Sequence, residues 1–340
     1  MAFSDHRAEL LAHFDQMPPL LTSKYIARAW TDICESRLWS FLVGHGVLIS
    51  PAIITTGTAA VTRFSNQVTL NSAAAAVWDA LPSSELLYAP IEKRQFRSGS
   101  TSGELYTVAD YVSPTVYLDR VFTSETAAAA NYQLFRAFYE PPFPALAYGI
   151  GTATPAASST PEPEFLRFES VVDSESGYPL RLGFKQTDLN QGDPQRSSQG
   201  QPYRVVDYKA DVNGKPLYEL WPHPTAARAY PTVYIKKQTA YAADADTLPA
   251  SFPEDVVLER AMWYASMWAQ KQVGRFPGYR PVNWSFIAAE HRNNHMRELA
   301  KAKTRDEETF NQMITMSPLM RGRMSPIDAK FAQSHDVDWM

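Results

Sequence analysis

Helical periodicity is confined to the two ends of this 340-residue chain. Apolar residues recur at helical spacing from Ser23 to Leu42 and again from Ser251 to Gln312, whereas the roughly two hundred residues between them alternate mainly with a period of two. An amphipathic helix must bury its apolar stripe against another element. We therefore expect the terminal helices to pack together, and the middle of the chain to form strands and turns.

This order predicts an α+β fold with a helical platform from the N- and C-terminal segments, a large, mostly antiparallel β insertion and an extended C-terminal tail. The expected parts are residues 1–50 (N-terminal helical segment), 51–140 (first β module), 141–163 (proline- and serine-rich loop), 164–250 (second β module), 251–315 (C-terminal helices) and 316–340 (tail). The expected core of the platform consists of Ile26, Trp30, Ile33, Leu38, Phe41, Val257, Ala261, Ala265 and Trp268.

Local signals mark the ends of the expected helices. Ser23 suits an N-cap, and Gly44 and Gly46 are expected to end the first helix. Ser251-Phe252-Pro253-Glu254 has the form of a capping box, which predicts the start of a second helix. The glycine and prolines of Gly274–Val282 predict a connector before the last helix, expected over about Asn283–Met313.

Two sets of strands are expected in the middle of the chain. Gly57–Leu70 predicts a hairpin with its turn near Ser65-Asn66, and Asn213-Gly214 predicts a two-residue hairpin loop. A short helical turn is possible over Ala73–Leu81. The first set, expected to close into a small barrel or sandwich, continues with Ile91–Arg97, Leu105–Asp110, Thr115–Asp119 and Tyr132–Phe138. The second set is Glu164–Val172, Pro179–Phe184, Tyr203–Lys209, Leu217–Trp221 and Ala229–Gln238.

Composition indicates an ordinary globular chain, with 45% hydrophobic and 20% charged residues. The net charge of −4 has no basic segment that would indicate nucleic-acid binding. A single cysteine, Cys34, excludes an intrachain disulfide and fits a reducing compartment. Met1–Leu20 resembles neither a signal peptide nor a membrane span, so we expect a soluble, non-secretory protein without membrane contact.

No catalytic, cofactor or metal site is predicted. His291 and His295 have the i, i+4 spacing of two metal ligands on a helix, but Arg292 stands where a zinc protease needs a glutamate. Cys34 has apolar neighbours and is expected to be a packed thiol. Solvated side chains are the expected outcome for the acidic pairs Asp207/Asp211 and Asp244/Asp246, and packing is expected for Trp39 and Trp221.

Several segments together carry a resemblance to a known family. They are Tyr25–Trp30, Leu38–Leu42, the Gly57–Thr69 hairpin, Arg94–Arg97, Tyr106–Val108, Val116–Arg120 and Tyr132–Phe135. In this arrangement the chain resembles the head-to-tail adaptor (connector) proteins of tailed bacteriophages, over Ser23 to Met313. In that family an amphipathic helix leads into a Gly-Thr-x-x-Val-Thr hairpin, and helices close the domain.

The resemblance implies a non-enzymatic virion protein of the neck, which assembles in the host cytoplasm as a ring of twelve copies. Its implied partners are the portal protein, a tail nozzle or tube, and double-stranded DNA that passes through the channel without specific binding. The C-terminal tail has apolar anchors but no core, and by the resemblance it docks on the portal. The expected docking residues are Met316, Leu319, Met320, Arg321, Arg323, Phe331, Trp339 and Met340.

Two alternatives to this function remain open at this point. A tail nozzle or stopper protein belongs to the same structural class. A tail-associated carbohydrate-binding or hydrolytic protein, which would use the aromatic β region, belongs to a different one.

Overall fold

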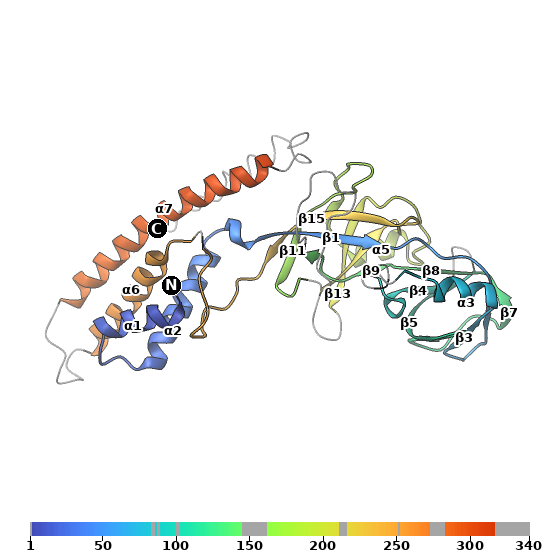
Figure 1. Ribbon diagram of the computed structural model, residues 1–340, viewed down its shortest axis with the longest axis horizontal. Coiled ribbons are helices and arrows are strands. Elements are labelled where there is room, and N and C mark those ends of the chain that lie inside the picture. The colour runs from blue at the N-terminus through green and yellow to red at the C-terminus, as the bar shows by residue number, and fades with distance from the viewer. Residues whose placement is uncertain are drawn as a thin grey trace. The chain divides into compact units, whose positions relative to one another are not determined.

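The computed structural model describes residues 2–82, 86, 89–99, 103–144, 162–210, 216–250, 252–272 and 283–316. The chain divides into two compact units (Figure 1). One unit contains both chain ends, Met1–Val43 and Lys237–Met340, and the other contains Gly44–Lys236. Each unit has a core of its own, as expected when the two parts of a long chain bury separate sets of apolar residues.

The first unit is helical, and its helices pack around a core rich in aromatic and small residues. Trp39 and Phe252 meet edge to face with their ring centroids 5.2 Å apart, and Trp30 packs on the same phenylalanine at 5.4 Å. Along α6 the buried side chains include three alanines, which allow α7 to run beside it (Figure 1). The helices are α1 (Phe3–His13), α2 (Pro19–Glu35), α6 (Glu254–Gln272) and α7 (Trp284–Met316), with a 3₁₀ turn η1 (Ser40–Leu42).

The second unit contains a seven-stranded sheet of order β7-β2-β3-β6-β5-β4-β8. The first and last strands of this order, β7 and β8, are separated in the chain only by Asn131, so the sheet curls into a nearly closed barrel. Its interior holds residues such as Phe96, Val108 and Trp78. The strands are β2 (Ala59–Val61), β3 (Gln67–Leu70), β4 (Gln95–Ser98), β5 (Leu105–Val112), β6 (Thr115–Leu118), β7 (Ala127–Ala130) and β8 (Tyr132–Phe135).

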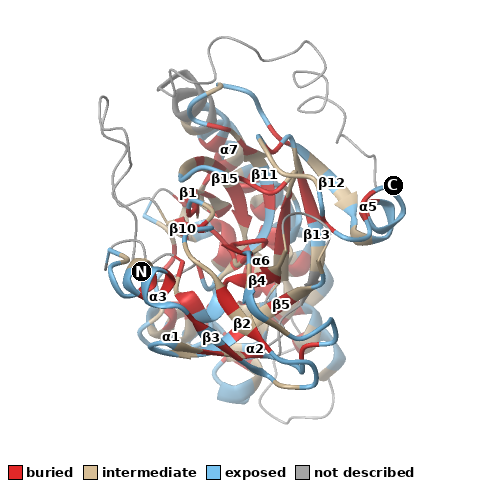
Figure 2. Cartoon of the chain, turned by 90° about the vertical axis from the view of Figure 1, so that its right-hand side faces the viewer, coloured by how far each residue is buried: buried red, intermediate tan, exposed pale blue. Residues whose placement is uncertain are grey.

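Two four-stranded sheets, of order β10-β1-β15-β11 and β12-β13-β14-β9, complete this unit. They share a second core that includes Phe165, Tyr218 and Tyr234. Buried residues follow most strands of the unit in Figure 2, whereas in helix α5 only Leu189 is buried. The strands are β1 (Val43–Ser50), β9 (Phe138–Tyr139), β10 (Phe143–Pro144), β11 (Phe165–Val171), β12 (Arg181–Lys185), β13 (Arg204–Ala210), β14 (Pro216–Trp221) and β15 (Arg228–Lys236). The short helices are α3 (Ser72–Asp79), η2 (Ile91–Lys93) and α5 (Gln186–Gly192).

The predicted fold class is wrong. Within the described residues the chain is a mixed α/β protein, rich in sheet, whose strands are mostly antiparallel and form one nearly closed barrel. The terminal helices are one of two compact units and are not a platform for an α+β fold. The strand pair β12 and β13 is moreover parallel. The small barrel or sandwich expected for the first strand set is present as the nearly closed barrel, but periodicity carries no information about the division of the chain into two units.

The expected ends of the first helix are also wrong. Helix α2 begins at Pro19, because a proline at the first helical position loses no hydrogen bond, and it ends at Glu35. Gly44 and Gly46 do not stop a helix. They lie in strand β1, and a Cβ atom built on Gly44 would come within 2.4 Å of the Tyr234 ring. Glycine is needed at both positions because a Cβ atom would clash with neighbouring atoms. The sequence predicted a helix end there because glycine often terminates helices.

Several local predictions are confirmed. The hairpin forms as β2 and β3, with Val61 opposite Val68. Strands form where alternation predicted them in β5, β6, β8, β11 and β13, and the short helical turn is α3. Other predictions concern residues outside those described: Ser251, Gly274–Val282, Asn213-Gly214, most of the 141–163 loop and the tail beyond Met316.

The close contact at Gly44 gives a first testable prediction. We expect Gly44→Ala to destabilise the β unit by about 1–3 kcal/mol, because the Tyr234 ring is buried and cannot move aside without strain. The matched control is Gly192→Ala at the end of α5, where a Cβ atom meets nothing within 4 Å. The control should be neutral or stabilising by up to about 1 kcal/mol. Denaturant unfolding measures both, and a Gly44→Ala midpoint equal to that of the native chain would contradict the packing argument.

Candidate functional site

The residues predicted to dock on the portal lie almost entirely outside the described part of the chain. Met316 is the last residue of α7, and its side chain is not described. The remaining positions are Leu319, Met320, Arg321, Arg323, Phe331, Trp339 and Met340. Their docking role therefore stays a prediction.

The residues predicted to form the helical core lie in the helical unit, with one exception. Leu38 is 37% exposed, so its predicted core position is wrong. Helix α2 ends at Glu35, and the helical spacing that placed Leu38 inside no longer applies beyond that residue. The residues that belong to the core cluster or pack against it are Ile26, Trp30, Ile33, Phe41, Val257, Ala261, Ala265 and Trp268.

The two histidines of α7 bind neighbouring atoms of α6. His291 Nδ1 lies 2.7 Å from Glu259 Oε2, and His295 Nδ1 lies 3.0 Å from the Val256 carbonyl oxygen. Burial lowers the pKa of His295, which favours its neutral ring. Both rings therefore serve helix packing through their Nδ1 atoms.

The packed thiol predicted for Cys34 is confirmed. The side chain is buried in the helical core, and burial raises its pKa to about 12. The thiolate, which is the nucleophilic form, is therefore scarce at neutral pH. Trp39 is fully buried in the same core, so packing is confirmed there too.

The acidic pairs do not form a catalytic dyad in the described residues. Asp246 accepts hydrogen bonds from the backbone N–H groups of Ala242 and Ala243, and Asp244 pairs with Arg7 at 2.7 Å. Asp207 is exposed on β13, whereas Asp211 lies outside the described residues. These carboxylates hold a turn, pair with a cation or face solvent.

The β unit contains a buried ionic cluster that was not predicted from the sequence. Its centre is Arg196, which adopts a left-handed φ of 54° after helix α5. The Arg196 guanidinium donates to Glu219 Oε1 at 2.7 Å, to the Asp193 carbonyl oxygen at 2.7 Å and to Asn190 Oδ1 at 2.6 Å. A non-glycine residue in this backbone region costs free energy, which this side chain's three hydrogen bonds offset.

Asp193 holds the loop that carries Arg196. Its carboxylate accepts hydrogen bonds from the backbone N–H groups of Ser197 and Ser198 and from Trp221 Nε1. Burial by itself raises the pKa of Asp193, but these hydrogen bonds outweigh it and hold that pKa well below its ordinary value. The loop is therefore fixed by an ionised carboxylate, and half-buried Trp221 is tied to it.

Two further titratable groups of the cluster are fully buried on β14 and just after it. Burial raises the pKa of Glu219 to about 7, and Arg196 opposes that rise. Burial, with the nearby Arg97 and Arg196, lowers the pKa of His223 to about 3. The His223 ring packs on Phe135 of β8 with the centroids 5.2 Å apart. The imidazole is consequently uncharged at neutral pH.

The cluster joins the barrel to the rest of the β unit. Arg97 of β4 donates from Nη2 to the carbonyl oxygens of Gln195 and Arg196, at 2.9 and 2.7 Å. Gln133 of β8 accepts a hydrogen bond from Gln199 at 2.7 Å. Perturbed titratable groups often mark active sites. Here, however, Arg196 joins Glu219 to Asp193 by hydrogen bonds, and none of the cluster's titratable groups lines either surface hollow described next, so the arrangement serves structure.

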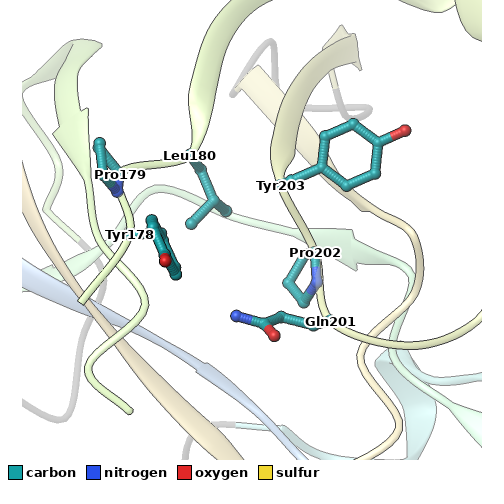
Figure 3. A pocket seen from close by; sticks show the side chains of 6 residues that line it. All are labelled: Tyr178, Pro179, Leu180, Gln201, Pro202 and Tyr203. Carbon is teal, nitrogen blue, oxygen red and sulfur yellow. The ribbon is translucent and has the colours of Figure 1, made fainter. Parts of the chain in front are cut away.

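Two hollows open on the surface of the β unit. The smaller has a volume of about 230 Å³ and lies between Tyr178–Leu180 and Gln201–Tyr203 (Figure 3). In this view the Gln201 amide points toward Tyr178, while the Tyr203 ring points away. Gln201 Nε2 also donates to Asp173 at 3.1 Å. The pocket's lining residues include no carboxylate or histidine, so they offer no acid–base pair.

The larger hollow is a groove of about 610 Å³ across strands β11 to β14. Its lining combines the aromatic rings of Tyr208 and Tyr218 with the carboxylates of Glu169 and Asp207. Although Asp207 is exposed, its partial removal from water in the groove raises its pKa. Such a groove has the volume and the mixed lining of a ligand site.

Comparison with known proteins adds no assignment, because neither the models of protein families nor the curated proteins give a match. In the described ranges, no helix is long and apolar enough to cross a membrane. The same residues contain no group of three or more His, Cys, Asp or Glu side chains placed to hold a metal ion.

His223 gives a prediction of pH dependence. Its pKa is about 3 in the folded protein against an ordinary 6.5, so its contribution to stability is complete above pH 6.5 and is lost as the pH falls toward 3. We expect His223→Gln to flatten the loss of stability between pH 6.5 and 4. Glu219, whose raised pKa acts in the opposite direction, is present in both proteins and largely cancels. Unfolding free energies measured across this range check the expectation, and parallel pH profiles would contradict it.

Proposed function

We propose that this protein is a head-to-tail adaptor of a tailed bacteriophage. It forms a ring between the portal and the tail and extends the channel through which the DNA passes. The proposal places the protein in the neck of the virion, gives it a structural role without catalysis, and assigns it portal, tail and self contacts. A ring of identical subunits requires a heterologous contact that closes by rotation.

One observation carries this proposal. Most of the segments that resemble connector proteins become neighbouring strands of the same barrel sheet. Phe96 of β4 is opposite Tyr106 of β5 and Leu134 of β8, and Val68 of the hairpin is opposite Val116 of β6. The resembling segments therefore lie together in one sheet, as a domain shared with the connector proteins requires.

The charge of the chain is compatible with the proposed channel. A net charge of −4 repeated around a ring gives an acidic assembly, which repels the phosphate backbone. DNA would then move past the ring without being gripped. A protein that bound DNA through its phosphates would need a basic surface, and its affinity would fall with added salt.

The tail supplies the test of this function. The full chain, mixed with the portal protein from the same genome, should give ring-shaped complexes in electron-microscopy class averages. Deleting residues 317–340 should abolish portal binding and leave the thermal midpoint unchanged, because the tail is expected to add no core. A second variant keeps the tail length and replaces Arg321, Phe331 and Trp339 with Ser. It should also fail to bind, which would assign the loss to these side chains and not to the shortened chain. Unchanged portal binding by the truncated chain would refute docking by the tail, and absence of a complex with the full chain would refute the adaptor.

The same images separate the adaptor from a nozzle or stopper protein. An adaptor contacts the portal directly, whereas a nozzle or stopper attaches to a later component of the tail. Binding of the full chain to the purified portal protein therefore identifies an adaptor, and binding to a purified tail component alone identifies a nozzle or stopper protein.

The groove favours a second candidate function, carbohydrate binding by a tail-associated protein. Aromatic rings such as Tyr208 pack on the apolar faces of sugars, and the carboxylates of Glu169 and Asp207 can accept hydrogen bonds from hydroxyl groups. If this function is correct, the isolated protein binds purified envelope polysaccharide in a calorimetric titration, and Asp207→Asn weakens binding at least tenfold. An adaptor gives no binding signal, and polysaccharide binding that Asp207→Asn leaves unchanged would rule out the groove.

A further inference from the structure

Helix α7 buries only one of its faces within the described chain. The buried positions Ala288, His295, Leu299 and Ala302 recur at spacings of seven, four and three, so they lie on one side of the helix. Leu299 and Ala302 belong to the helical core, and His295 is bonded to α6. This inner face accounts for the attachment of α7 to its own unit.

A second row of residues follows the side of α7 away from this core. Phe286, Ala289, Asn293, Met296 and Ala300 succeed one another at spacings of three and four, and all are exposed. Phe286 is 66% exposed and Met296 is 57% exposed. Spacings of three and four keep a row on one side of a helix and are typical of a helix that packs on another helix. We call these five residues the outer row.

The outer row is complementary to itself when two copies run antiparallel. A two-fold axis that passes through Asn293 relates the two copies. A residue a given number of positions before Asn293 in one copy then lies at the same height along the helices as the residue the same number of positions after Asn293 in the other copy, because each residue advances the helix by about 1.5 Å. Phe286 then meets Ala300 of the second copy, and Met296 meets Ala289 within about one residue of height. Each large side chain thus faces a small one, which is the condition for close helix packing.

The charges beside the outer row agree with the antiparallel direction. Glu290 lies three residues before Asn293 and Arg297 lies four residues after it, so the axis brings Glu290 of one copy beside Arg297 of the other, twice. Both side chains are exposed. A parallel pair would instead place Phe286 on Phe286, Ala289 on Ala289 and like charges together. Size and charge therefore select the same orientation.

From these observations we propose that the outer row of α7 is a two-fold contact between two copies of this chain. The contact is isologous, with the same surface used by both copies. The row spans 286–300, about 21 Å of helix, which is small for a stable interface. We therefore expect the dimer to be weak and reversible. This inference does not depend on the adaptor function, because a closed two-fold contact cannot by itself build a head-to-tail ring.

Sedimentation velocity of the full chain tests the contact. The sedimentation coefficient should rise from monomer to dimer as the concentration increases through the micromolar range, and Met296→Lys should weaken the dimer at least tenfold. Leu166→Lys is the matched control, because Leu166 is 48% exposed on β11 and outside the outer row, and it should leave the dimer unchanged. A chain that stays monomeric, or a dimer insensitive to Met296→Lys, would overturn the proposal.

A charge exchange distinguishes the contact from a general effect on folding. Glu290→Arg and Arg297→Glu should each weaken the dimer, and the double variant should restore it, because the two groups meet only across the proposed axis. Helix content measured by circular dichroism verifies that the single variants are folded. Failure of the double variant to recover the dimer would refute the antiparallel pairing.

Cross-linking fixes the direction of the two helices. Asn293→Cys should form a disulfide-linked dimer under mild oxidation, since the axis places the two residues 293 together. Phe286→Cys should not cross-link with itself but should do so with Ala300→Cys in a mixture. The native Cys34 is buried, with a raised thiol pKa, and is a poor competitor. Cross-linking of Phe286→Cys with itself would indicate a parallel pair and exclude the proposed contact.

Discussion

The buried pair of Arg196 and Glu219 is the interaction on which the β unit most depends. Both side chains are almost completely removed from water, and such burial costs several kcal/mol per ion unless the charges and hydrogen-bonding atoms are matched. The left-handed backbone at Arg196 aims its guanidinium at Glu219, and Asp193 fixes the loop that carries it. Arg97 extends the same network to the barrel. Apolar packing alone tolerates many arrangements of two sheets and a barrel, whereas this set of hydrogen bonds fits only one.

Local elements could be predicted from the sequence, but their assembly could not. Alternation of apolar residues was sufficient for strands such as β6 and the first half of β5, because buried positions there alternate with partly exposed ones. Strand β1 was missed because Gly44 and Gly46 resemble helix stops, whereas the Tyr234 ring next to Gly44 and the Phe143 carbonyl oxygen next to Gly46 explain them. Helix α1 was missed because its apolar residues form no marked stripe. The predicted fold class was wrong for a related reason, since the division into a helical unit and a β unit depends on contacts between segments far apart in the sequence.

The ionic cluster could likewise be predicted from the sequence only in part. Arg196 stands in a polar loop that resembles any exposed turn, and nothing near it in the sequence indicates burial. Glu219 did carry a signal, because it interrupts the apolar run Leu217–Trp221, where a charged side chain must be either exposed or paired. Its partner lies 23 residues earlier, beyond the reach of periodicity. A buried charge can therefore be suspected from sequence, but its counter-ion must be found in three dimensions.

The composition of the helical core explains why α7 has apolar residues to spare. Helix α6 presents Ala261, Ala265 and Ala269 to the core, and α7 contributes Ala288 and Ala302. Small residues allow two helices to approach closely, so the contact between α6 and α7 is complete without the larger side chains of the outer row. The large apolar side chains of the outer row, Phe286 and Met296, are mainly exposed in the single chain and leave apolar surface in water. A neighbouring copy removes that surface from water, and the two-fold contact and the proposed ring thus make separate demands on the same helical unit.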